Sequence, residues 1–117
     1  MARSDFNWVS FQHDFTAISP TVTKEFSIEG SQNPVDDAYL LIQVRGVSDD
    51  NHKISINNTD LPGQDLQPAP SNSLAWLLWM KHIRPGILKS GMNTITITRA
   101  ANDDFRIGGV AINWREP

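Results

Sequence analysis

The feature that most constrains the fold of this chain is a strict alternation of threonine and isoleucine at residues 94–97. Successive side chains of an extended strand point to opposite faces, so Ile95 and Ile97 share one face and the threonines share the other. A helix, with 3.6 residues per turn, would spread the same residues around its surface. The segment therefore predicts a β-strand that is buried on one face and hydrated on the other.

Residues 53–57 and 109–114 repeat this pattern. We interpret the three segments as neighbouring strands that form one face of a β-sandwich. Their apolar side chains would build one inner face, which consists of Ile54, Ile56, Ile95, Ile97, Val110, Ile112 and Trp114. The opposite face would be small, polar and flat, and it consists of Ser55, Asn57, Thr94, Thr96, Thr98, Ala111 and Asn113.

The rest of the chain also alternates between strand patterns and turn residues. Further strands are predicted at residues 5–15, 21–28 and 38–47. Residues 38–47 are the most continuous apolar run, which is typical of a central strand. The polar turn at residues 48–51 predicts that this strand forms a hairpin with the next one, and Gly108-Gly109 predicts a bend or bulge.

Residues 74–83 fit two periodicities. Helical spacing groups Trp76, Trp79, Met80 and Ile83, and strand spacing groups Trp76, Leu78, Met80 and His82. We interpret this run as a strand because its neighbours are strands. Trp76 and Trp79 then lie on opposite faces, so one should point into the core and the other into solvent.

These patterns predict a single all-β domain over residues 1–117. The expected architecture is an antiparallel two-sheet β-sandwich of jelly-roll type with about eight strands. A chain of this length buries roughly two-thirds of its unfolded surface, so it needs no disulfides, and it contains no cysteine. Trp8 and Trp114 are expected in the core.

Charge and hydropathy exclude several classes of function. The formal net charge is −3 with acids and bases interspersed, so no basic face for nucleic acid is expected. No stretch approaches eighteen apolar residues, which argues against a membrane span. Residues 1–6 lack the apolar run of a signal peptide, which suits the cytoplasm without fixing the compartment.

Residues 54–58 and 87–97, followed by the closing apolar strand, resemble the galactose-binding-domain-like jelly rolls. This group includes the sugar-binding domains of family 2 glycoside hydrolases and many carbohydrate-binding modules. The resemblance covers roughly the second half of the chain and implies a tight turn at Gly91 and an Asn93 side chain bonded to the backbone. Asn58 stands where the family has glycine, and asparagine tolerates the positive φ of such a turn. Members bind sugars, bind proteins or serve as structural accessories, so the resemblance implies a fold rather than one activity.

The long proline-containing loop at residues 61–73 is the first candidate for a functional region. It precedes the two indoles, and the outward one is expected to stack on a sugar ring. The predicted ligand-binding residues are Asn58, Asp60, Asp65, Trp76, Trp79, His82 and Arg84.

No catalytic residue, metal ligand or cofactor is predicted. The three histidines have no metal-ligand spacing, no serine lies in a nucleophile elbow, and the loop acids have no carboxylate partner. Three acidic pairs lie in predicted loops, at Asp36-Asp37, Asp49-Asp50 and Asp103-Asp104. Oxygen-rich loops can hold calcium, and the resembled jelly rolls often carry one, so a structural calcium stays an alternative although turns favour aspartate anyway.

The sequence therefore predicts a non-catalytic binding module with carbohydrate as the favoured ligand. The alternative is a structural or assembly protein whose sheet face or aromatic loop packs against copies of itself or a larger particle. In either case the expected partner is a carbohydrate or a protein.

Overall fold

The computed structural model describes residues 3–48, 52–61, 75–100 and 103–117, and every helix or strand in these ranges is a β-strand. The strands are β1 (Arg3–Phe15), β2 (Thr21–Ile28), β3 (Val35–Arg45), β4 (Lys53–Ile56), β5 (Thr59–Asp60), β6 (Leu77–Ile83), β7 (Gly91–Thr98) and β8 (Phe105–Glu116). The predicted all-β chain of about eight strands is confirmed. No helix in the described ranges has the length and apolarity needed to cross a bilayer.

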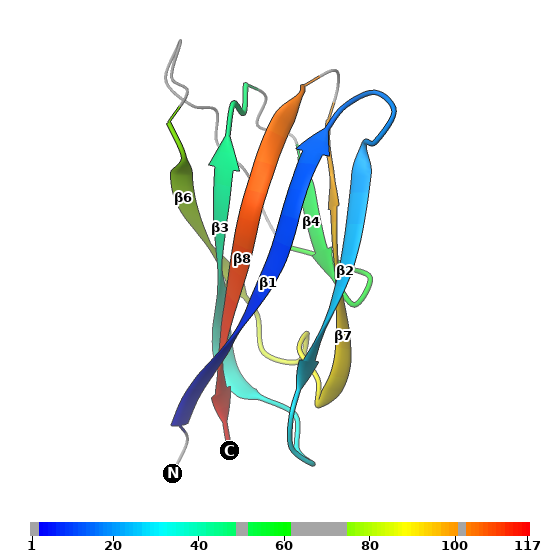
Figure 1. Ribbon diagram of the computed structural model, residues 1–117. Coiled ribbons are helices and arrows are strands. Elements are labelled where there is room, and N and C mark those ends of the chain that lie inside the picture. Colours follow the sequence, from blue (N-terminus) through cyan, green and yellow to red (C-terminus); the bar gives the residue numbers. More distant parts are fainter. Residues whose placement is uncertain (1–2, 49–51, 62–74, 101–102) are drawn as a thin grey trace.

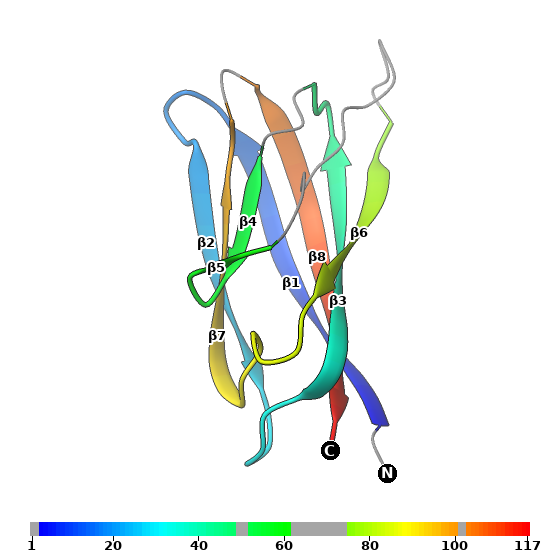
Figure 2. The same cartoon turned by 180° about the vertical axis from the view of Figure 1, so that it is seen from behind.

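The strands form two four-stranded sheets that lie face to face (Figures 1 and 2). The strand orders are β1-β8-β3-β6 and β2-β7-β4-β5, and every pair is antiparallel. In Figure 1 the first sheet lies at the left and centre and the second sheet at the right, and Figure 2 shows both sheets from behind. The antiparallel two-sheet sandwich is therefore confirmed.

The prediction that the three alternating segments are neighbours in one sheet is wrong for the last segment. Strands β4 and β7 pair with each other, but β8 lies in the opposite sheet between β1 and β3. The expected hairpin of residues 38–47 with the next strand is also wrong, because β3 and β4 belong to different sheets. Alternation shows which side chains point inward, but both inner faces of a sandwich carry the same pattern.

The core fills the space between the sheets. All seven side chains of the predicted inner face are buried, although they come from both sheets. The largest fully buried side chains are Phe15, Ile28, Leu40, Ile42, Ile54, Ile56, Ile83, Ile95, Ile97, Ile107 and Ile112. Trp114 is in the core as predicted, but the prediction for Trp8 is wrong, since this side chain is largely exposed. Its neighbour Val9 points inward, so Trp8 must point outward.

The turn that the family resemblance implied is present. Asn57 and Asn58 have positive φ values of 53° and 66°, and Gly91 has a φ of 89°. The buried Asn93 amide accepts from Lys89 N–H (3.0 Å) and from Asn57 Nδ2 (2.8 Å), and it donates to the carbonyls of Lys89 and Gly91. Asn93 therefore fixes the entry into β7 by bonding the backbone, as expected.

The predicted irregularity at Gly108-Gly109 is also present. Between Val110 and Ile107, β8 has one residue more than the facing part of β3, which is the pattern of a bulge. Strand β1 carries its own extra residue opposite, near Gln12, whose φ is 46°. The two irregularities therefore lie next to each other on the paired strands β1 and β8.

Candidate functional site

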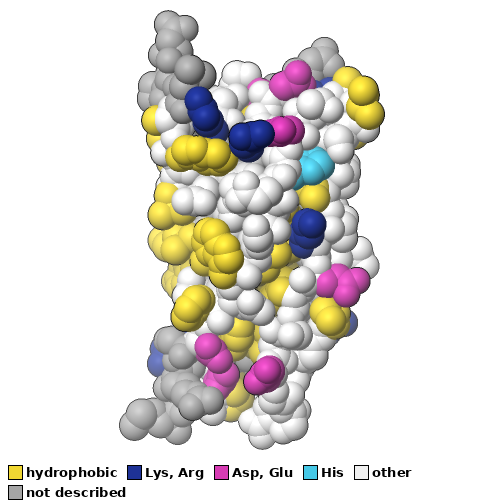
Figure 3. All heavy atoms as spheres, viewed as in Figure 1, with side chains coloured by type: hydrophobic (Ala, Val, Ile, Leu, Met, Phe, Trp, Pro, Cys, Tyr) yellow, Lys and Arg dark blue, Asp and Glu magenta, His cyan; other side chains and the backbone are white. Residues whose placement is uncertain are grey.

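The β1-β8-β3-β6 sheet carries an apolar outer face. Six large hydrophobic side chains on it are exposed by 41–65%, namely Phe6, Trp8, Tyr39, Trp76, Leu78 and Met80. Hydrophobic side chains accordingly gather over β6, β3 and β8 in the space-filling view (Figure 3). A concentration of this kind on one sheet face is unusual for a freely hydrated surface and indicates an interaction site.

The strand register arranges these side chains in rows across the sheet. The first row consists of Phe6, Asn113, Tyr39 and His82. The second row consists of Trp8, Ala111, Leu41 and Met80. The third row consists of Ser10, Gly109, Gln43 and Leu78. We call these rows, together with Trp76 and Gly108, the apolar face, and none of its residues is Asp, Glu, Lys or Arg.

Charged groups begin at the ends of the apolar face. At one end, the Arg106 guanidinium donates hydrogen bonds to the Asp14 carboxylate across β8 and β1. These bonds lower the pKa of Asp14 and raise the pKa of Arg106. At the other end, His82 Nε2 lies 2.7 Å from Asp37 Oδ1, and the His82 ring lies near that of Tyr39.

Two glycines form a floor under two indoles. A Cβ atom at Gly109 would lie 2.0 Å from Trp8 Cζ2, so the Trp8 ring rests directly against the Gly109 backbone. A Cβ atom at Gly108 would lie 3.4 Å from Trp76 Cζ3 and 3.0 Å from Gln43 Oε1. Trp8 comes from the edge strand β1 and Trp76 directly precedes the other edge strand, β6. The backbone of the bulge therefore lies beneath two indoles, one from each edge of the sheet.

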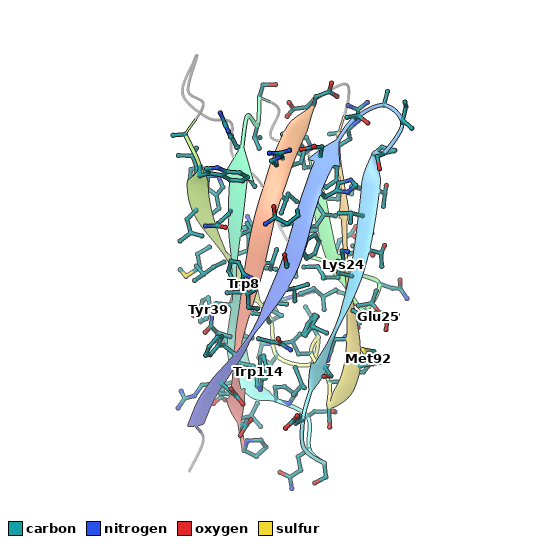
Figure 4. All side chains as sticks on the ribbon, viewed as in Figure 1. Trp8, Lys24, Glu25, Tyr39, Met92 and Trp114 are labelled. Carbon is teal, nitrogen blue, oxygen red and sulfur yellow. The ribbon has the colours of Figure 1, made fainter. Side chains whose placement is uncertain are left out.

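The outer face of the other sheet has the opposite chemistry. Threonines pair across β2 and β7, and the hydroxyls of Thr23 and Thr96 lie 3.1 Å apart. Met92 is the one large exposed hydrophobic side chain on the described strands of this sheet. Figure 4 shows Met92 away from Trp8 and Tyr39. The sandwich therefore has one apolar and one hydroxyl-rich outer face.

The predicted ligand-binding residues are divided between these surfaces. Trp76 and His82 belong to the apolar face, and the exposed Arg84 directly follows β6. Asn58 and Asp60 are exposed on the β4–β5 hairpin of the other sheet. Asp65 lies outside the described residues. The predicted strand at residues 74–83 is confirmed for Leu77–Ile83.

The question of which indole points outward has a clear answer. Trp76 is exposed, whereas Trp79 is half-buried and packs against the core. The sequence interpretation missed Phe6, Trp8 and Tyr39 as surface residues. Their signal was available in part, because Phe6 and Trp8 have the parity opposite to the buried Val9.

A Ser-His-Asp trio, in which His52 and Asp103 are buried and Ser48 is exposed, lies away from the apolar face. The Asp103 carboxylate accepts hydrogen bonds from the Ser48 hydroxyl and from His52 Nε2, both at 2.7 Å. The Ala100 N–H donates to His52 Nδ1 at 2.8 Å, so the ring proton is on Nε2. Serine and histidine both bond the carboxylate rather than each other, unlike a nucleophile and its base. The trio therefore fastens the β3–β4 connection to the β7–β8 connection.

The structural calcium stays a prediction. Within the described ranges, no three metal-ligating side chains gather. Asp49 and Asp50 lie outside those ranges, and Asp103 is bonded as described above.

The structure therefore defines a β-sandwich with one apolar outer face. A family model matches residues 3–116, and the chain belongs to that family, which is described as a family of unknown function (DUF7383). No curated protein sequence matches the chain.

Several solved structures share the fold. The serine protease of Aeromonas sobria matches with a TM-score of 0.68 and 7% identity over 100% of this chain and 27% of its own. Dimeric latent PorU from Porphyromonas gingivalis matches with a TM-score of 0.66 and 9% identity, over 98% of this chain and 13% of its own. A CBM35 from Paenibacillus barcinonensis matches with a TM-score of 0.54 and 11% identity, over 86% of this chain and 97% of its own. The chain thus spans only a small part of the first two proteins, and at these identities the likeness shows the β-sandwich fold alone.

Proposed function

We propose that this domain is a non-catalytic binding module that docks a protein surface on its apolar face. The observation that carries the proposal is the gathering of six exposed large hydrophobic side chains on one outer sheet face. The hydroxyl-rich face of the same sandwich is what simple hydration of a sheet requires. Hydrophobic residues on the first face therefore need a different explanation, and contact with a partner supplies it.

The composition of the apolar face supports a protein partner. Interface cores are enriched in aromatic residues and methionine and depleted of lysine and glutamate. The face contains Trp, Tyr, Phe and Met and lacks lysine and glutamate entirely. Leu78 and Met80 are among its most exposed side chains. Their aliphatic groups offer nothing to a sugar hydroxyl but gain free energy when another protein buries them.

Two methionines provide an internal test. Met80 lies on the apolar face and Met92 on the opposite outer face, and both are more than half exposed. Oxidative footprinting would compare them in dilute purified protein and in a native extract of cells that make the protein. We expect the extract to slow oxidation of Met80 severalfold relative to Met92. Oxidation of Met80 that is as fast as that of Met92 in both samples would contradict docking on this face.

Carbohydrate binding is a second candidate because two indoles lie over the glycine floor. Aromatic rings stack on the apolar faces of sugars, and Gln43 and Asn113 on the same face can bond hydroxyls. Titration with soluble glycans, followed by tryptophan fluorescence, would test it. A glycan that shifts the wild-type emission but not that of Trp76→Ala would support this candidate. Unchanged emission across a broad glycan set would reject it.

A further inference from the structure

We infer that the partner on the apolar face is a second copy of this chain, stacked face to face about a twofold axis that runs along the strands between β8 and β3. This inference rests on the proposed function. It adds the identity of the partner and the register of the contact.

Under this symmetry, the raised and low parts of the apolar face of one copy fit the low and raised parts of the other. In the first and second rows the β8 side is low, because its outward residues there are the half-buried Asn113 and Ala111, whereas the glycine floor is already covered by the two indoles. In the same two rows the β3 side is raised, because its outward residues there are Tyr39 and Leu41. The axis places β3 of each copy over β8 of the other. Each ridge then fills the partner copy's trough, as stacked sheets about 10 Å apart require.

The edge strands match in the same arrangement. Strand β1 of one copy lies over β6 of the other, so within the second row the Trp8 indole faces the other copy's Met80 thioether. Contacts between sulfur and an aromatic ring are favourable. In the first row Phe6 faces His82. A twofold contact repeats every pairing, so each favourable match occurs twice.

Area and charge both fit a dimer. Aromatic side chains expose roughly 150–250 Å² when free, so six large side chains at the observed exposures offer on the order of 700 Å². A standard interface buries about 800 Å² on each partner. The rows carry no Asp, Glu, Lys or Arg, so pairing like with like creates no charge repulsion within them. An uncharged face also provides no charge complementarity for selecting a different partner.

A matched pair of arginine substitutions tests the inference. Ala111→Arg places a long cation in the trough, whereas Thr96→Arg places the same charge on a central strand of the opposite outer face. Both positions are half-buried and point outward. Sedimentation velocity over a concentration series would measure the dimer dissociation constant of the purified full chain. Circular dichroism would confirm that each variant is folded.

We expect wild type and Thr96→Arg to form the same reversible dimer, and Ala111→Arg to weaken it at least about tenfold, which is 1.4 kcal/mol. A wild-type chain that stays monomeric at the highest concentration would overturn the inference, as would a folded Ala111→Arg variant with an unchanged dissociation constant. If the purified chain is monomeric but Met80 is protected in the extract, the second copy is the wrong partner while the proposed function stands. If Met80 is unprotected in both samples, both proposals fail.

Discussion

At the residue scale, the Asn93 amide uses both of its polar atoms inside the protein. It bonds the backbone on both sides of the turn into β7 and also bonds the Asn57 side chain. We expect Asn93→Ala to lower the free energy of unfolding by about 2–4 kcal/mol, because it leaves several buried polar groups without partners. Urea denaturation would measure the loss.

The neighbouring turn provides the control for Asn93. Asn58 is exposed and has a positive φ, which glycine adopts without strain. Asn58→Gly should therefore change the free energy of unfolding by less than about 0.5 kcal/mol. Equal losses for the two variants would mean that the Asn93 network is not the source of the stability.

Gly109 and Trp8 form a second pair that acts as a unit. A methyl group at Gly109 would overlap the Trp8 ring, so Gly109→Ala should displace the indole and lower stability by about 1–3 kcal/mol. The same substitution in a Trp8→Ala background should have a much smaller effect, because the overlap is gone. A double-mutant cycle of unfolding free energies checks this coupling. Additive effects would show that Trp8 does not rest on Gly109.

At the element scale, the sequence predicts where the strands are better than it predicts which strands pair with each other. The alternation at β4, β7 and β8 correctly identifies which side chains are buried, because a period of two is a property of each strand alone. It does not identify the sheet, because β8 presents the same inward pattern from the opposite layer. The apolar face escaped prediction for a related reason. Its rows are assembled from three outward residues on each of four strands, and these strands are distant in the sequence.

Strand β6 shows what parity can establish. The sequence placed Trp76 and Trp79 on opposite faces but not which one points inward, and the structure places Trp79 against the core. We expect Trp79→Ala to lower the free energy of unfolding by about 3–5 kcal/mol and Trp76→Ala by about 1 kcal/mol or less. Thermal or urea unfolding of the two variants would measure the difference. A larger loss for Trp76→Ala would reverse the assigned orientation of the strand.

At the scale of the whole molecule, stability and recognition depend on different surfaces: the inner faces of the sheets form the core, and we propose that one outer face binds the partner. The core between the sheets is complete without either outer face, because its buried side chains come from the inner faces alone. Substitutions on the apolar face can therefore change association without unfolding the domain. This separation makes the role of the apolar face accessible to experiment.

The salt dependence of association follows from the same arrangement. Each chain has a net charge of −3, so two copies repel weakly. The proposed stacking also brings Arg106 of each copy toward the other copy's Arg45 at the end of the face, where Asp14 offsets part of the charge. Salt screens this repulsion, and sulfate strengthens apolar burial. Sedimentation at low and high sodium sulfate should therefore show a severalfold tighter dimer at high salt for both wild type and Thr96→Arg. A dimer that dissociates as salt is added would instead be held by ion pairs, which the apolar face does not contain.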